Sequence, residues 1–154
     1  MRRCIVIADD DPTIISLVKL RLGMARYNVL CAHDATAALK MVQDNQPVAV
    51  ILDVQMPGGG GGPLPGGLSA LEKIKSDPRL SDLPVMMLTG ERDPATVMQA
   101  MSGGAGDYMV KPFHPDALLE RVSRLIKSSA MVWANPLVSP VVKPASAAGP
   151  VWEL

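Results

Sequence analysis

Aspartate residues follow two short apolar segments of the chain, at the positions where buried strands would end. Asp9 and Asp10 come directly after residues 4–8, and Asp53 follows residues 48–52. If both segments are neighbouring strands of a parallel sheet, their carboxylates converge at one edge of that sheet. Crowded carboxylates need a cation, and Mg²⁺ prefers such oxygen ligands. The sequence therefore predicts a magnesium-binding acidic cluster around Asp53, a candidate nucleophile.

Two further polar residues follow apolar segments in the same way. Thr89 comes after residues 85–88, and Lys111 comes after residues 107–110. A carboxylate can accept a phosphoryl group when positive charge neutralises the approaching anion, which an ammonium and a metal ion would do. The Thr89 hydroxyl could then donate to a phosphoryl oxygen. Each residue alone could be a helix cap or a solvated loop residue, but their shared position favours one phosphoryl-accepting site.

The segments that would position these residues alternate between short apolar runs and amphipathic stretches. We expect strands at residues 4–8, 29–32, 48–52, 85–88 and 107–110, each followed by a helix. Asp11 and Asp34 are expected to cap the first two helices. This alternation predicts an α/β fold with a parallel sheet covered on both faces.

The expected inner faces of the five helices are, in chain order, Ile14, Leu17, Val18 and Leu22; Ala35, Ala38, Leu39 and Val42; Leu68, Leu71 and Ile74; Val97, Met98 and Met101; and Leu118, Val122, Leu125 and Ile126. Glu120, Arg121, Arg124 and Lys127 are expected to face water.

Composition narrows the class of protein. A chain of 154 residues with 48% hydrophobic residues is long enough for one domain with a core. Its 15 basic and 15 acidic residues give no net charge, so direct nucleic-acid binding is not expected. The first apolar run is too short for a signal peptide or a membrane span, so we expect a cytoplasmic protein without membrane contact. Cys4 and Cys31 are expected to be reduced thiols in the core.

Four segments together resemble the receiver domain of bacterial two-component response regulators: residues 5–12 (IVIADDDP), 51–58 (ILDVQMPG), 87–90 (MLTG) and 106–113 (GDYMVKPF). The resemblance covers about residues 1–128. It implies a flavodoxin-like doubly wound (βα)5 fold with strand order 2-1-3-4-5. It also implies that Asp53 is the phosphoacceptor and that Asp10, Asp53 and the backbone carbonyl of Gln55 bind Mg²⁺, with Asp9 assisting. Thr89 and Tyr108 would be the switch residues, and the Lys111-Pro112 bond would be cis.

Two segments depart from the family pattern. Residues 58–67 form a glycine- and proline-rich insertion that lacks the Gly-Lys-Ser or Gly-Lys-Thr of a nucleotide-binding loop, so we expect a flexible insertion, with partner recognition as the alternative. Residues 129–154 are rich in proline and alanine, and we expect a tail without an output domain. The fourth helix lacks the charges of receivers that dimerise through it, so a monomer or weak dimer is expected.

These features predict a stand-alone receiver. It would accept phosphate from a histidine kinase or phosphotransfer protein and change a surface that binds a downstream protein target. It would catalyse only its own Mg²⁺-dependent phosphorylation and dephosphorylation, with Gln55 and Glu91 tuning the lifetime of the modified state. The alternatives are a phosphorelay intermediate or phosphate sink, and an aspartate-nucleophile phosphohydrolase that turns over an outside substrate.

Overall fold

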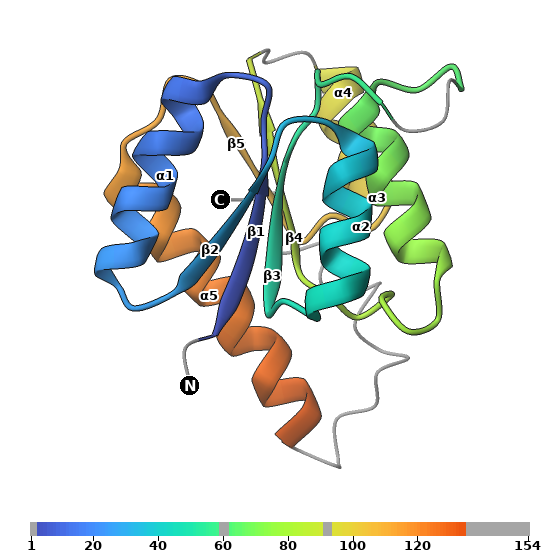
Figure 1. The fold of residues 1–154 in the computed structure, drawn as a ribbon. Coiled ribbons are helices and arrows are strands. Elements are labelled where there is room, and N and C mark those ends of the chain that lie inside the picture. Colours follow the sequence, from blue (N-terminus) through green and yellow to red (C-terminus); the bar gives the residue numbers. More distant parts are fainter. Residues whose placement is uncertain (1–2, 59–61, 91–93, 135–154) are drawn as a thin grey trace.

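The computed structural model describes residues 3–58, 62–90 and 94–134, which form a parallel sheet between two layers of helices (Figure 1). The strands are β1 (Cys4–Ala8), β2 (Asn28–Ala32), β3 (Ala49–Asp53), β4 (Val85–Thr89) and β5 (Asp107–Val110). The helices are α1 (Pro12–Met24), α2 (Ala35–Asn45), α3 (Gly66–Ser76), α4 (Pro94–Ser102) and α5 (Pro115–Ala134). The strands lie in the order β2-β1-β3-β4-β5. The predicted flavodoxin-like doubly wound fold is confirmed.

The register of the sheet aligns the carboxyl ends of its strands. Ala8 pairs with Leu52, so the residues that follow each of them leave the sheet at the same level. Asp53 pairs with Leu88, and Thr89 pairs with Val110, the residue before Lys111. The polar residues expected to share a site are therefore brought to one edge.

Two apolar cores lie on opposite faces of the sheet because successive strand residues point to opposite sides. One core joins alternate strand residues such as Val6 and Leu52 to the inner faces of α2, α3 and α4. The other joins Ile7 and Ile51 to α1 and α5. Figure 1 shows α1 and α5 together on one side of the sheet and α2 and α3 on the other. Both faces are thus covered, which explains why the strands are almost continuously apolar.

Side-chain caps begin the first two helices as expected. The Asp11 carboxylate accepts from the backbone N–H of Thr13 at 2.9 Å, and Pro12 occupies the first helical turn, where no backbone donor is needed. The Asp34 carboxylate accepts from the N–H of Ala37 at 2.7 Å. Both carboxylates satisfy backbone donors that the helices leave unpaired.

The inner faces of the helices match the expectation in most positions but not in two. Leu17 of α1 and Met98 of α4 were expected to be buried, and both are exposed, at 38% and 66% of their surface. In α1 the buried position beside Val18 and Leu22 is Ile15, and in α4 it is Ala100. Leu39 and Leu125 are partly buried against the two cores.

Two helices extend into the segments that were expected to be a loop insertion and a tail. The last two glycines of the 58–67 segment, Gly66 and Gly67, belong to α3, and α5 continues past residue 128 to Ala134. The prediction for Glu91, and the parts of the insertion and tail predictions that concern residues 59–61 and 135–154, fall outside the described residues.

The two cysteines and the lengths of the helices can also be compared with the sequence-based expectations. Cys4 and Cys31 are free and partly buried, and burial raises the pKa of both thiols. Within residues 3–58, 62–90 and 94–134, no helix has the length and apolar character needed to cross a bilayer.

Candidate functional site

Three carboxylates meet at the carboxyl edge of the sheet. One oxygen from each of Asp9, Asp10 and Asp53 lies within 4.8 Å of the other two. Asp9 directly follows β1 and Asp53 ends β3, two adjacent strands inside the sheet, and both residues are buried. Asp10 is exposed at the start of the turn into α1. The cluster thus has two buried charges and one that opens to solvent.

Lys111 neutralises part of this cluster from the end of β5. Its ammonium nitrogen lies 2.7 Å from Asp9 Oδ2 and 3.3 Å from Asp53 Oδ1. The other oxygen of Asp9 accepts from the backbone N–H of Asp11 at 2.9 Å. Among the described residues, Asp9 Oδ2 has no well-aligned hydrogen bond, so its contact with Lys111 is mainly a charge pair.

One ammonium does not compensate three carboxylates, and the ionisation of the site reflects this imbalance. Burial, and then the neighbouring charge of Asp9, raise the pKa of Asp53 to about 6, although Lys111 opposes the shift. Burial works to lower the pKa of Lys111, but its contacts with Asp9 and Asp53 hold that pKa above its ordinary value. The lysine therefore stays charged, and one lysine does not fully compensate the negative charge around Asp53.

The donor set fits a divalent cation with a preference for oxygen. The cluster offers carboxylate oxygens within 4.8 Å of one another, and Asp9 Oδ2 is buried without a well-aligned donor among the described residues. Mg²⁺ uses one or two protein carboxylates and completes its shell with water or phosphate oxygens, which the exposed side at Asp10 admits. The acidic pocket thus has the ligands of a magnesium site.

Thr89 and Lys111 are connected through the backbone. Thr89 ends β4 and is 3% exposed, and its carbonyl oxygen accepts from the N–H of Lys111 at 2.7 Å. The Lys111–Pro112 peptide bond is cis, as expected. Tyr108 is half-buried and packs against the core formed with α2, α3 and α4. Lys111 therefore borders the acidic cluster, and Thr89 is joined to Lys111 through the backbone. The switch roles of Thr89 and Tyr108 stay predictions.

Two glycines at the start of α3 allow this helix to contact the backbone around Asp53, which the sequence interpretation missed. A Cβ atom on Gly67 would lie 2.0 Å from the carbonyl oxygen of Asp53, and one on Gly66 would lie 2.0 Å from that of Met56. Real side-chain carbons do not approach so closely, so only glycine fits. The Gly67 N–H also donates to the carbonyl oxygen of Val54 at 3.0 Å. Gly66 and Gly67 thus hold α3 against the strand that carries Asp53.

The start of the glycine-rich segment has an anchor of its own. The carbonyl oxygen of Pro57 accepts from the N–H of Ala35 at 2.8 Å, so the chain after β3 contacts the first turn of α2. Gly58 follows with a φ of +95°, and a Cβ there would lie 3.0 Å from the Ala35 nitrogen. The segment is therefore fixed at both ends, at Pro57–Gly58 and at Gly66–Gly67.

A second missed contact links β5 to α5. The Arg121 guanidinium donates to both carboxylate oxygens of Asp107, at 2.8 and 2.6 Å. Arg121 was expected to face water, but this buried carboxylate holds it against the end of the strand. Bidentate pairs of this kind fix side-chain geometry as well as charge.

The comparisons with known proteins agree with this geometry. Residues 5–123 match the family model of the response regulator receiver domain. The fold and the acidic edge define a receiver of two-component signalling. The chain belongs to the response regulator receiver family.

Two of the curated relatives that the chain resembles are named as transcriptional regulators. The chain is 30% identical over 145 residues to the transcriptional regulatory protein KdpE of Staphylococcus aureus, covering 90% of this chain and 59% of that protein. It is 34% identical over 123 residues to the DNA-binding dual master transcriptional regulator RpaA of Synechocystis, covering 80% of this chain and 48% of that protein. The chain thus spans about half the length of these curated relatives.

Solved structures of receivers match most of the chain. A putative response regulator from Chloroflexus aurantiacus aligns with a TM-score of 0.75 and 31% identity, over 82% of this chain and 99% of that one. The chemotaxis response regulator CheY4 of Vibrio cholerae aligns with a TM-score of 0.72 and 28% identity, over 81% and 99%.

Proposed function

We propose that this chain is a phosphorylation switch in which Asp53 accepts a phosphoryl group from a histidine kinase or a histidine phosphotransfer protein. The observation that carries the proposal is the placement of Lys111 within 2.7 and 3.3 Å of Asp9 and Asp53, beside a third carboxylate, Asp10. A buried nucleophilic carboxylate, an adjacent ammonium and a cation-binding pair of aspartates are the groups that phosphoryl transfer to aspartate requires.

In the proposed reaction a carboxylate oxygen of Asp53 attacks phosphorus. A P–O bond forms, the bond between phosphorus and the donor imidazole nitrogen breaks, and the bonding pair leaves with the imidazole. The product is an acyl phosphate on Asp53. Lys111 would neutralise a phosphoryl oxygen. Its ammonium now lies 2.7 Å from the Asp9 carboxylate, so it would have to divide its positive charge between Asp9 and the phosphoryl group.

We propose Asp10, Asp53 and the backbone carbonyl of Gln55 as ligands of Mg²⁺, with Asp9 adding negative charge behind them. When bound, Mg²⁺ would neutralise charge on the phosphoryl oxygens and help to align the group. On this proposal the chain catalyses its own phosphorylation and dephosphorylation and turns over no outside substrate.

The phosphodonor would dock beside the site, and α1 offers a suitable surface. Leu17, Leu20 and Met24 follow one another at helical spacing and are 38%, 65% and 70% exposed. Such spacing places the three side chains on one face of α1, which begins directly after the aspartates. An exposed apolar stripe of this kind favours contact with a partner helix.

The signal would leave through β4, β5 and the helices next to them. In the modified state the Thr89 hydroxyl would donate to a phosphoryl oxygen, and Tyr108 would move into the space released beside β5. Because the Thr89 carbonyl oxygen accepts from the Lys111 N–H, movement of the β4 end is transmitted to β5. We propose that this changes the surface that binds a downstream protein.

The remaining parts of the prediction concern the whole protein. We propose a cytoplasmic receiver that acts by protein contact, as a monomer or weak dimer and without direct nucleic-acid binding. RpaA of Synechocystis carries a DNA-binding name, and this chain spans 48% of that protein. The alternative is a phosphorelay intermediate or phosphate sink, in which Asp53 passes its phosphoryl group on or loses it to water.

A phosphotransfer experiment with purified components tests the proposal. We expect label from a phosphorylated histidine donor to appear on the wild-type chain in the presence of Mg²⁺ and on Asp44→Asn, which removes an exposed carboxylate far from the site. We expect no label on Asp53→Asn, or on wild type in EDTA. Equal labelling of Asp53→Asn would refute the site. Transfer of the label onward to a second histidine protein would identify the relay alternative.

A further inference from the structure

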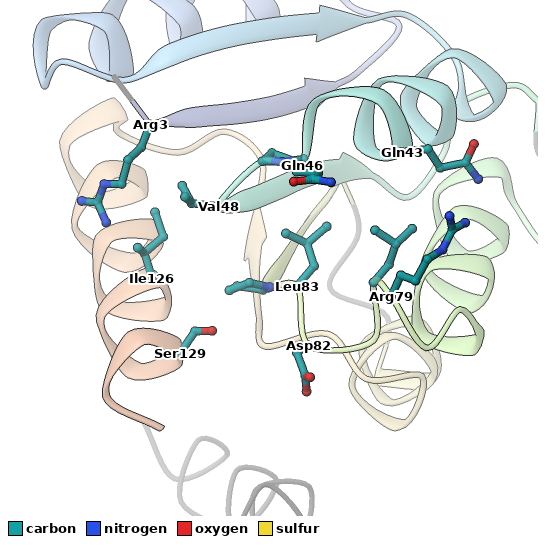
Figure 2. A pocket seen from close by; sticks show the side chains of 12 residues that line it. Arg3, Gln43, Gln46, Val48, Arg79, Asp82, Leu83, Ile126 and Ser129 are labelled. Carbon is teal, nitrogen blue, oxygen red and sulfur yellow. The ribbon is translucent and has the colours of Figure 1, made fainter. Parts of the chain in front are cut away.

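The edge of the sheet opposite the aspartates contains a groove with no role in phosphoryl transfer. It has a volume of about 560 Å³ and lies where β1, β3 and β4 begin (Figure 2). The turn before β3, the connection from α3 to β4, and α5 form its walls. In Figure 2, Ile126 and Ser129 of α5 lie on one side of the groove, and Arg79, Asp82 and Leu83 lie on the other.

Apolar residues line the inside of this groove. Leu80 and Leu83 pack against the core formed with α2, α3 and α4, whereas Ile126 and Val48 belong to the opposite core or pack against it. The two cores therefore approach each other here, around the edge of the sheet. A segment that covered these side chains would extend both cores at once.

Hydrogen-bond donors are found at the rim. The side chains of Gln43 and Gln46 at the end of α2 line the groove, as do those of Arg3 and Arg79. Amides and guanidinium groups donate to carbonyl oxygens. An apolar interior with donors around it suits an extended, proline-rich segment, whose carbonyl oxygens have no partners within the segment.

The chain itself contains a segment of this chemistry. Residues 136–144 read PLVSPVVKP, in which proline recurs every fourth residue and is followed each time by apolar residues; one charge, Lys143, occurs in the nine positions. Segments that remain unfolded are usually rich in charge and poor in valine and leucine. This composition instead suits an extended segment that buries its side chains against another surface.

The last turns of α5 lie close to the groove. Ser129 already lines the groove, and α5 ends five residues later at Ala134, about 7.5 Å further along the helix axis. Residues 136–144 in an extended conformation cover about 28 Å. This is long enough to return along α5 and cross the groove.

We propose that residues 136–144 fold back from the end of α5 and occupy the groove between α5 and the connection from α3 to β4. The occupied groove would hold the last turns of α5 against the sheet. The contact is intramolecular, so it is present at any protein concentration.

Paired substitutions in the full chain test this proposal. Val141→Asp with Val142→Asp places a charge toward the groove whichever of the two neighbours faces it. We expect the melting temperature to fall by roughly 2–8 °C. The matched control, Ala147→Asp with Ala148→Asp, adds the same charge outside the segment and should leave the melting temperature unchanged. Equal shifts in the two variants would overturn the proposal.

A spin label locates the segment directly. In a Cys4→Ser, Cys31→Ala background, a label on Ser139→Cys should broaden the amide signals of Gln46, Val48 and Leu83 and spare those of Met24 and Met98. Broadening centred elsewhere, or uniform broadening, would refute the proposal. Broadening that appears only between labelled and unlabelled molecules in a mixture would show that a second copy fills the groove, which also refutes it.

Discussion

The ammonium of Lys111 lies 2.7 Å from the buried Asp9 carboxylate, which is the shorter of its two contacts with the acidic cluster. The same ammonium is 3.3 Å from Asp53, so its electrostatic attraction to Asp53 is weaker than its attraction to Asp9. Burial and the charge of Asp9 then raise the pKa of Asp53 to about 6. The unmodified site is therefore under electrostatic strain at neutral pH, and a cation or a proton relieves it.

The first prediction concerns the stability of the metal-free protein as a function of pH. The unfolded-state pKa of an aspartate is about 3.9. Between pH 3.9 and about 6 the folded protein binds a proton at Asp53 that the unfolded chain does not bind. The free energy of unfolding therefore decreases as the pH rises through this range and increases as the pH falls. Asp53→Asn should therefore stabilise the fold at pH 7.5, by on the order of 2 kcal/mol. The gain should shrink toward pH 4.5.

Urea unfolding in EDTA at several pH values measures this difference. Asp44→Asn, at an exposed carboxylate, is the control and should give a small difference that hardly depends on pH. A stability gain of Asp53→Asn that is the same at pH 4.5 and 7.5 would contradict the raised pKa.

The second prediction concerns Asp10 and Mg²⁺. Asp10→Asn removes the exposed charge of the cluster, which should stabilise the metal-free protein by on the order of 1 kcal/mol and weaken Mg²⁺ binding. Ligands that bind the folded state stabilise it by an amount that grows with the logarithm of the ligand concentration divided by Kd, and the melting temperature rises accordingly. Mg²⁺ titrations followed by thermal melting should show a clear upward shift for wild type and for Asp44→Asn, and a much smaller one for Asp10→Asn. Equal shifts in all three proteins would rule out Asp10 as a ligand.

The third prediction concerns Gly67, where a Cβ atom would lie 2.0 Å from the Asp53 carbonyl oxygen. Gly67→Ala should destabilise the fold by about 3 kcal/mol or more, because the backbone of α3 or that of Asp53 and Val54 must move to make room for the methyl group. Gly62→Ala is the matched control, since a Cβ there meets nothing within 4 Å, and it should change stability by less than about 0.5 kcal/mol. Denaturant unfolding compares the two. If Gly67→Ala is as stable as Gly62→Ala, α3 does not pack against β3 as described.

The fourth prediction compares two arginines of α5. Arg121→Gln leaves the buried Asp107 carboxylate without its bidentate partner and should cost about 2 kcal/mol. Arg124→Gln removes an exposed pair with Glu120 and should cost at most about 0.5 kcal/mol. Thermal melts of both variants in low salt test the difference. Similar losses would mean that the Asp107 pair is no stronger than a surface contact.

The sequence predicted which polar residues meet at the carboxyl edge of the sheet because they occupy positions that a local pattern reveals. Asp53, Thr89 and Lys111 each follow an apolar run, and parallel strands end at one edge whatever the details of packing. The caps at Asp11 and Asp34 are local for the same reason, since donor and acceptor are two or three residues apart.

The features that the sequence did not predict depend on contacts between distant segments. Periodicity finds an apolar position on a helix but cannot tell whether a neighbouring element covers it, which is why Leu17 and Met98 were placed in the core and are exposed. Arg121 lies on the polar side of α5 by periodicity, yet the path of that helix over the end of β5 brings it to Asp107. The close approach at Gly67 depends on the angle at which α3 meets β3.

Both anchors of the glycine-rich segment, at Pro57–Gly58 and at Gly66–Gly67, lie on the sheet and helix framework, so the residues between them can be exchanged without touching either anchor. Lengthening such a connection costs about 0.6 kcal/mol per doubling. The position after Gly62 is therefore a grafting point for an epitope or a fluorescent reporter. A reporter inserted there would be anchored at Gly67, which contacts the Asp53 carbonyl group, and its signal would test for the phosphorylation that we propose at Asp53.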